Sequence, residues 1–156
     1  MGPMVLRRAA DAPTRRVLVE RLADAPAVAL PSRATEGSAC FDLRSCERAV
    51  LRRGRVVLVR TGLRMTAPRG TFLEVRPRSG LGSKGVLMVN APGTIDRDYS
   101  GEVRVPLTYL FAGHYTVEVG DRIGQVRLVD DVPARFVLGR VRPSPSRAGG
   151  FGSTGR

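Results

Sequence analysis

The chain has 156 residues, which suits a single domain, and it carries 26 Lys and Arg residues against 14 Asp and Glu residues, for a formal net charge of +12. Every basic residue except Lys84 is an arginine. No apolar run approaches the roughly 20 residues that span a bilayer, and the N-terminus lacks the apolar stretch of a signal peptide. We therefore expect a soluble intracellular protein, in cytoplasm or nucleus, with no membrane partner.

Short β-type runs follow a polar N-terminal extension. Residues 1–16 are rich in Arg, Ala and Pro, and we expect this basic extension to be disordered. The runs after it lie at 17–19, 56–59, 71–76, 86–89, 103–111, 123–129 and 135–138. Turn residues separate the runs, and no long segment has the 3.6-residue period of an amphipathic helix. Residues 17–141 are therefore predicted to form one all-β domain, a sandwich or a jelly roll, with at most a helical turn after 77–79.

The chain ends in a proline-stiffened linker and a glycine-rich flap, which together form a flexible C-terminal arm over residues 142–156. Glycines let backbone N–H groups approach an anion, the hydroxyls of Ser153 and Thr154 add donors, and the ring of Phe151 can stack on a base. A solvated tail is the plain interpretation. A flap that closes over a nucleotide is the alternative, and the rest of the chain favours it.

The arginine-rich stretch, the cysteines and the histidine admit plain interpretations. Residues 44–64 contain seven Arg and one Glu, which could indicate a nucleic-acid surface, but no aromatic residues interleave with them, so a solvated face is favoured. Cys40 and Cys46 are too few for a zinc site, and we expect free thiols. His114 is expected in a surface turn.

Carboxylates and polar residues concentrate in two segments. Residues 90–102 can be explained as a hairpin with Asp caps, because Asp and Asn are disfavoured in strands. Beside a phosphate site, a carboxylate of this segment would also suit a general base, and Tyr99 would offer a flat surface for a sugar. Asp42, in the strand-like run 39–44, is either an ordinary edge-strand residue or an outer-shell metal partner.

Two further segments hold side chains that commonly bind phosphate. Residues 77–82 place Arg78, Ser79 and two glycines at a strand end, where a guanidinium, a hydroxyl and exposed N–H groups can converge. A plain turn predicts the same residues nearly as well. A second turn then enters a strand with Arg122 and Gln125 three positions apart.

These segments, in this order and at these distances, resemble the five motifs of the trimeric dUTP pyrophosphatase (dUTPase) family. Each motif alone is only suggestive, whereas five in series are highly specific. The resemblance covers the chain from about Val17 to its C-terminus, and its five segments are 39–43, 77–82, 93–103, 122–125 and 149–155.

The resemblance implies the fold, the reaction and the assembly. It implies a jelly-roll domain of the dUTPase-like β-clip type, and a homotrimer whose active sites are shared between subunits. The implied activity is the Mg²⁺-dependent hydrolysis of dUTP to dUMP and pyrophosphate, which limits uracil incorporation into DNA and supplies dUMP for thymidylate synthesis.

The resemblance also implies roles for individual residues. Asp96 matches the catalytic aspartate that activates the attacking water, and Asp42 matches the carboxylate that holds the metal through water. Tyr99 matches the ring packed under the deoxyribose, and Asn90 and Gly93 match the uracil-reading edge. The implied phosphate contacts of the domain are Arg78, Ser79, Gly80, Arg122 and Gln125, and the implied substrate contacts of the arm are Arg147, Phe151, Gly152, Ser153 and Thr154.

The chain departs from the family pattern at a few positions. Cys40 and Phe41 replace a Gly and a Tyr in the first motif, and Ser146 stands where the family has an Arg, with Arg147 as the neighbouring substitute. Three alternatives are weighed beside an active dUTPase: a dCTP deaminase-like enzyme, a dUTPase-like regulatory or interaction module, and a basic nucleic-acid binder. The Gly-Phe-Gly-Ser-Thr flap argues against the deaminase.

Overall fold

The computed structural model describes residues 14–25 and 27–142. The basic extension up to residue 13 lies outside this part, as do Arg147, Phe151, Gly152, Ser153 and Thr154 of the arm. The predicted roles of these residues, and the predicted domain boundaries, therefore stay predictions. Among the described residues, no helix has both the length and the apolar character needed to cross a membrane.

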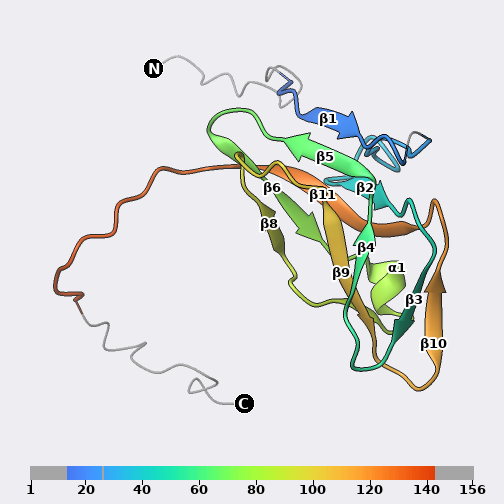
Figure 1. The fold of residues 1–156 in the computed structure, drawn as a ribbon. Helices are drawn as coiled ribbons and strands as arrows, with labels where there is room; N and C mark the ends of the chain where they lie inside the picture. Colours follow the sequence, from blue (N-terminus) through green and yellow to red (C-terminus); the bar gives the residue numbers. More distant parts are fainter. Residues whose placement is uncertain (1–13, 26, 143–156) are drawn as a thin grey trace.

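The described residues are almost entirely β-structure, which confirms the predicted all-β class (Figure 1). The strands are β1 (Leu18–Arg21), β2 (Phe41–Arg44), β3 (Ala49–Arg52), β4 (Val57–Arg60), β5 (Leu63–Thr66), β6 (Thr71–Arg76), β7 (Val86–Met88), β8 (Gly93–Ile95), β9 (Arg104–Tyr109), β10 (His114–Val117) and β11 (Arg122–Asp130). The single helical turn predicted after 77–79 is α1 (Ser79–Gly82). All strand pairs are antiparallel and form four small sheets, ordered β1-β5, β10-β3, β2-β11-β6-β8 and β4-β9-β7.

The four-stranded sheet separates an apolar face from a polar one. In β6, Leu73 and Val75 are buried in the core, while Glu74 and Arg76 alternate with them on the other face, as the two-residue period of a strand requires. In β2, Leu43 has no exposed surface, and its burial directs the preceding Asp42 to the polar face. Full burial of one such side chain stabilises the fold by roughly 1.5–3 kcal/mol.

The segment 135–138, predicted as a strand, is irregular and exposed in the structure. Phe136 is 101% exposed and Leu138 is 107% exposed, so neither packs on the domain. The segment has a strand-like composition, but a strand must pair with a neighbouring strand. After β11 the described chain runs away from the domain, so these residues have no strand beside them (Figure 1).

Four strands were not predicted, namely β3, β5, β8 and β10. Each has only three or four residues and includes an exposed polar side chain, so its period-two signal is weak. Residues 90–102 do not form the predicted hairpin, because β8 pairs with β6 whereas β9 pairs with β4 and β7. His114 begins β10, opposite Arg52 of β3, and is not in a turn as predicted, although it is exposed. Cys40 and Cys46 are free thiols, as predicted, and burial raises the pKa of Cys46.

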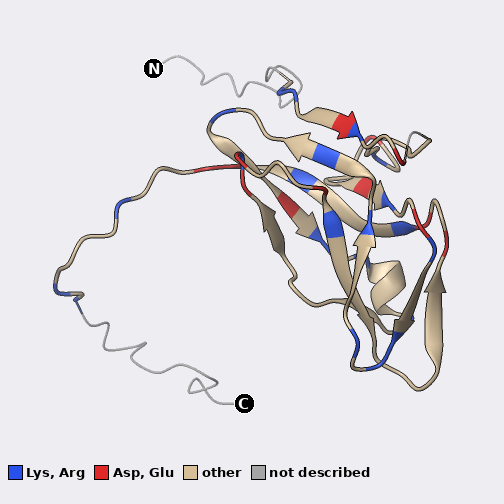
Figure 2. Ribbon diagram, viewed as in Figure 1, with Lys and Arg blue, Asp and Glu red and all other residues tan. Residues whose placement is uncertain are grey.

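Basic side chains are spread over the domain. Figure 2 shows Lys and Arg on several strands, on the turns and on the extended segment after β11, with acidic residues between them. Many of the arginines form ion pairs with carboxylates, including Arg48 with Glu118 and Arg127 with Glu74. This distribution fits the solvated face favoured from the sequence for residues 44–64.

Candidate functional site

A cluster around Asp42 lies at the β2 edge of the four-stranded sheet. The Asp42 side chain is 12% exposed, and Arg78 Nε donates a hydrogen bond to its Oδ1 over 2.9 Å. Arg122 Nη1 approaches the other oxygen at 3.4 Å. In the sheet register, Asp42 lies opposite Gln125, which lies opposite Arg76. The sheet thus lines up one carboxylate, one amide and one guanidinium across three strands.

A β-bulge in β11 and a hydrogen bond from Gln125 orient the side chains of this cluster. The register of β11 shifts between Arg122 and Gly124, and such a bulge re-aims the side chain beside it. Gln125 Nε2 donates to the carbonyl of Pro77 over 2.9 Å, which ties β11 to the residues just before α1. A pocket of about 400 Å³ results, lined by Asp42, Arg76, Arg78, Ser79, Gln125 and the 34–40 loop. Gly80 lines a neighbouring pocket together with Arg78 and Arg122.

A second pocket, the β8 pocket, has a volume of about 250 Å³ and lies at the β8 edge of the same sheet. Its lining includes Asn90, Gly93, Asp96 and Tyr99, so the structure brings together the four residues predicted to hold the base, the sugar and the attacking water. A Cβ atom at Gly93 would lie 3.1 Å from Asn90 Nδ2 and from Met88 Cε. Glycine at this position therefore keeps the pocket floor open.

The Tyr99 ring closes one side of this pocket. Its hydroxyl donates to the carbonyl of Glu102 over 3.0 Å, and the ring lies so close to Gly101 that a Cβ there would be 2.4 Å from the hydroxyl oxygen. Tyr99 is 46% exposed, so part of its surface remains accessible to a ligand. Asp96, at the start of the same loop, is exposed to solvent.

The two pockets lie at opposite edges of one sheet. The strand order β2-β11-β6-β8 separates the Asp42 edge from the β8 edge by three strand spacings. At about 4.8 Å for each spacing, the two edges are about 14 Å apart. Within one copy of the chain, the residues predicted for the phosphates and those predicted for the base therefore form two separate half-sites.

Comparison with known proteins identifies the family. The family model described as dUTPase matches residues 27–155. The chain belongs to the dUTPase family. It is 47% identical over 133 residues to the deoxyuridine 5'-triphosphate nucleotidohydrolase of Anaeromyxobacter sp. (strain Fw109-5), covering 84% of this chain and 90% of that protein. It is 44% identical over 149 residues to the enzyme of the same name from Dinoroseobacter shibae, covering 90% and 96%.

A solved structure supports the fold assignment. A mutant dUTPase of phage phi11 of S. aureus, whose structure reveals the coordination of a structural Mg(II) ion, superposes with a TM-score of 0.69 at 20% identity, covering 83% of this chain and 99% of that chain. The domain therefore has the jelly-roll, β-clip architecture of dUTPases. Membership of the family makes the chain a dUTP diphosphatase, which hydrolyses dUTP to dUMP and pyrophosphate.

Several pocket residues were given no role from the sequence. Arg104 and Thr94 line the β8 pocket, and Arg76 and Cys40 line the Asp42 pocket. Thr94 and Cys40 lie inside segments of the family resemblance, whereas Arg76 and Arg104 could have been found only by extending the strand period from a neighbouring motif. The side chain of Glu102 was also missed, because its partners are distant in the sequence.

The donor set of the Asp42 pocket suits Mg²⁺ that arrives with a triphosphate. Among the described residues, no group of three or more His, Cys, Asp or Glu side chains could hold a metal by itself. Asp42 is the only carboxylate among the residues lining this pocket. Mg²⁺ usually keeps several waters and is bound by one or two carboxylates plus substrate phosphates. A site with one carboxylate, in which the substrate phosphates supply the other oxygen ligands, matches this mode of Mg²⁺ binding.

Proposed function

We propose that dUTP is cleaved in sites assembled between copies of the chain in a homotrimer. In each site, the Asp42 half-site of one subunit faces the Asp96 loop of another. The observation that carries this proposal is the separation of the two half-sites to opposite edges of one sheet. Since one nucleotide must contact both, a second copy supplies the missing half.

Asp96 is the proposed general base. Its carboxylate is exposed at the mouth of the β8 pocket, where a water molecule can lie between it and the innermost phosphorus. Asp96 orients that water and takes its proton, the water oxygen bonds to phosphorus, and pyrophosphate leaves. A positioned base of this kind contributes roughly 10²–10⁴-fold to the rate.

Arg78, Ser79, Gly80, Arg122 and Gln125 are the proposed phosphate contacts. Arg78 is held in place by Asp42, so its guanidinium is oriented before the substrate arrives. The first N–H groups of α1, at Ser79 and Gly80, have no helical acceptor and are free to bind an anion. Together these donors stabilise the negative charge that moves onto the leaving pyrophosphate.

Asp42 is the proposed holder of Mg²⁺, through water. The ion, when bound, neutralises part of the triphosphate charge and orients its oxygens. The two arginines on Asp42 leave the cluster with a net positive charge, which favours the arrival of a metal-bound triphosphate over capture of a bare cation.

Asn90, Gly93 and Tyr99 are the proposed base and sugar contacts. Reading uracil by polar groups rejects a base with the wrong pattern, because the buried groups are then left unpaired. The Tyr99 ring packs under the deoxyribose and leaves no room for a 2′-hydroxyl. In the arm, Phe151 stacks on the base, and Arg147, Gly152, Ser153 and Thr154 contact the substrate.

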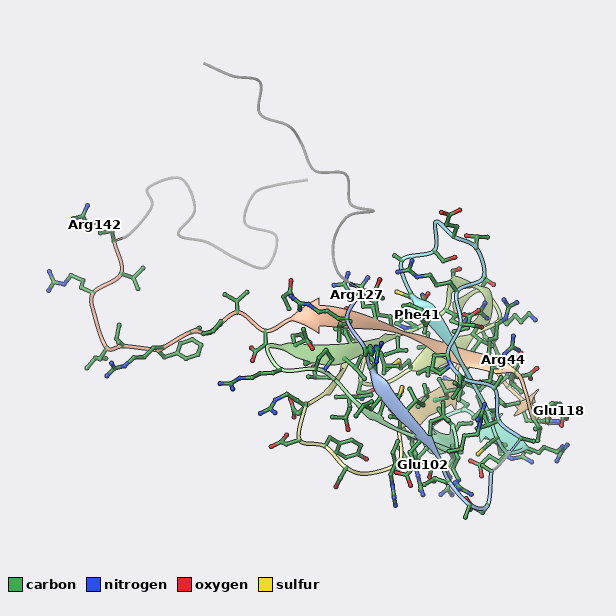
Figure 3. The ribbon with its side chains drawn as sticks, turned by 90° about the horizontal axis from the view of Figure 1, so that it is seen from above. Phe41, Arg44, Glu102, Glu118, Arg127 and Arg142 are labelled. Atoms are coloured by element: carbon green, nitrogen blue, oxygen red, sulfur yellow. The ribbon has the colours of Figure 1, made fainter. Side chains whose placement is uncertain are left out.

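Exposed apolar surface supports the homotrimer. The sheet β4-β9-β7 leaves Leu58, Leu87 and Val89 between 39% and 55% exposed. The extended segment after β11 carries Phe136 and Leu138 fully exposed, and Figure 3 shows it running away from the body as far as Arg142. Apolar surface of this extent is typical of subunit contacts.

Release of pyrophosphate from dUTP, dCTP, dTTP and UTP, each with and without Mg²⁺, tests the proposal. We expect Mg²⁺-dependent release from dUTP at a rate at least 10²-fold above the other three nucleotides. Equal rates with dCTP would contradict the proposed base contacts. An unchanged rate after removal of Mg²⁺ would contradict the role given to Asp42.

A further inference from the structure

A charge cluster built on one buried carboxylate lies at the end of the Tyr99 loop. Its centre is the Glu102 side chain, which is 7% exposed and is labelled in Figure 3. Glu102 accepts hydrogen bonds from Arg60 Nε over 3.0 Å, from the backbone N–H of Gly62 over 2.9 Å and from Arg104 Nε over 2.9 Å. Three donors from two separate parts of the chain, residues 60–62 and Arg104, thus fix one carboxylate.

The donors come from elements that are themselves well anchored. Arg60 ends β4 and Arg104 begins β9, and the two residues are paired opposite each other in the sheet. Gly62 occupies a left-handed conformation with φ +67, which a residue with a side chain rarely adopts. The hydrogen bond to Glu102 also raises the pKa of Arg60, so this guanidinium stays charged at every working pH.

Glu102 is connected to the β8 pocket in two ways. Its backbone oxygen accepts the hydrogen bond of the Tyr99 hydroxyl, and its carboxylate holds Arg104, which lines the same pocket as Asp96 and Tyr99. The ring of Tyr99 also packs on Gly101, where any side chain would displace it. The position of the ring therefore depends on where the backbone at residues 101 and 102 is held.

The structure assigns Glu102 as a positioning residue that sets the Tyr99 ring, and thereby the discrimination between deoxyribose and ribose. The inference rests on the proposed role of Tyr99 beneath the sugar. Glu102 is not among the residues that line the pocket of Asp96 and Tyr99, so no contact with the reacting phosphorus or the base is assigned to it. Its carboxylate anchors the end of the 96–102 loop to β4 and β9. Its backbone oxygen, held in place in this way, accepts the hydrogen bond from the Tyr99 hydroxyl.

Two Glu102 variants test the inference in a graded way. The readout is the ratio of the inhibition constant of UTP to the KM of dUTP, which requires no turnover of UTP. Glu102→Ala releases all three donors, and we expect the ratio to fall about tenfold. Glu102→Gln keeps one oxygen for Gly62 and Arg60 but turns an NH₂ group toward a guanidinium, so we expect a fall of about threefold.

The chain offers a matched control and a matched perturbation. Asp24 also binds Arg60, at 2.8 Å, but among the described residues it forms no hydrogen bond or ion pair with residues 96–102, so Asp24→Ala should leave the ratio unchanged within about twofold. Gly101→Ala pushes on the ring directly and should lower the ratio as Glu102→Ala does. The melting temperature of each variant separates loss of the fold from loss of discrimination.

Each outcome decides the inference. A parental ratio in Glu102→Gln, or in a folded Glu102→Ala, would overturn it. An equal fall in Asp24→Ala would also overturn it, because the effect would then belong to Arg60. If Glu102→Ala does not fold, Glu102→Gln decides alone. Failure of the proposed function would appear differently, as an unmodified enzyme that does not cleave dUTP.

Discussion

At the β2 edge of the four-stranded sheet, Asp42 is mostly buried and already bound by Arg78, whereas at the β8 edge Asp96 is exposed and the Tyr99 ring is half-exposed. The first half-site is a set of charges oriented before substrate binds. The second is the open β8 pocket with one free side. The difference fits a division of roles in the proposed trimer: preoriented charges suit a triphosphate, and an open edge suits a nucleoside that a second subunit would cover.

The largest expected effect is at the open edge. Asp96→Asn should lower kcat about 10³-fold, because an amide cannot take the proton of the attacking water. Asp96 is exposed, so the melting temperature and the affinity for a non-hydrolysable dUTP analogue should change little. Asp98→Asn is the matched control, an exposed carboxylate in the same turn, and should stay within about threefold of the parent. Parental turnover in Asp96→Asn would remove the base assignment.

The next effect is at the rigid edge. Arg78→Ala should lower kcat/KM for dUTP about 10²-fold, since it removes a phosphate donor and leaves Asp42 with less compensation. Steady-state kinetics measures the loss. Arg48→Ala is the control, because Arg48 pairs with the exposed Glu118 and should have no measurable effect. Equal kinetics in the two variants would show that the Asp42 cluster is not the phosphate site.

A smaller effect is expected from the arm. Deletion of residues 149–156 should lower turnover about tenfold or more, because the proposed flap excludes water and adds phosphate donors. The melting temperature should stay at the parental value, since the described domain ends before this segment. Single-turnover kinetics with the deletion variant checks the effect on chemistry. An unaltered rate would show that the flap takes no part in catalysis.

The sequence predicted the residues of the half-sites better than their arrangement. The all-β class, the α1 turn and the groups at Asp42, Arg78, Gln125, Asp96 and Tyr99 followed from turn chemistry, strand period and the resemblance of five segments. The register that sets Gln125 opposite Asp42 did not follow, because pairing between β2 and β11 joins residues about 80 positions apart. The bulge after Arg122 is equally invisible in a strand-like run.

Two other features could not be predicted, for different physical reasons. The Glu102 cluster depends on Arg60, 42 residues away, and a charged residue in a loop is normally solvated. The segment 135–138 has a strand composition but no partner strand within the described chain, so its conformation is set by what lies beside it and not by its own propensity.

Co-expression of Asp96→Asn and Arg78→Ala subunits with two different tags tests the shared site most directly. Trimers that carry both tags, purified in sequence, contain one site in three that combines an intact Asp96 from one subunit with an intact Arg78 from another. We expect such trimers to regain about one third of the parental kcat, although each variant alone is nearly inactive. Mixed trimers no more active than the two variants alone would contradict the account.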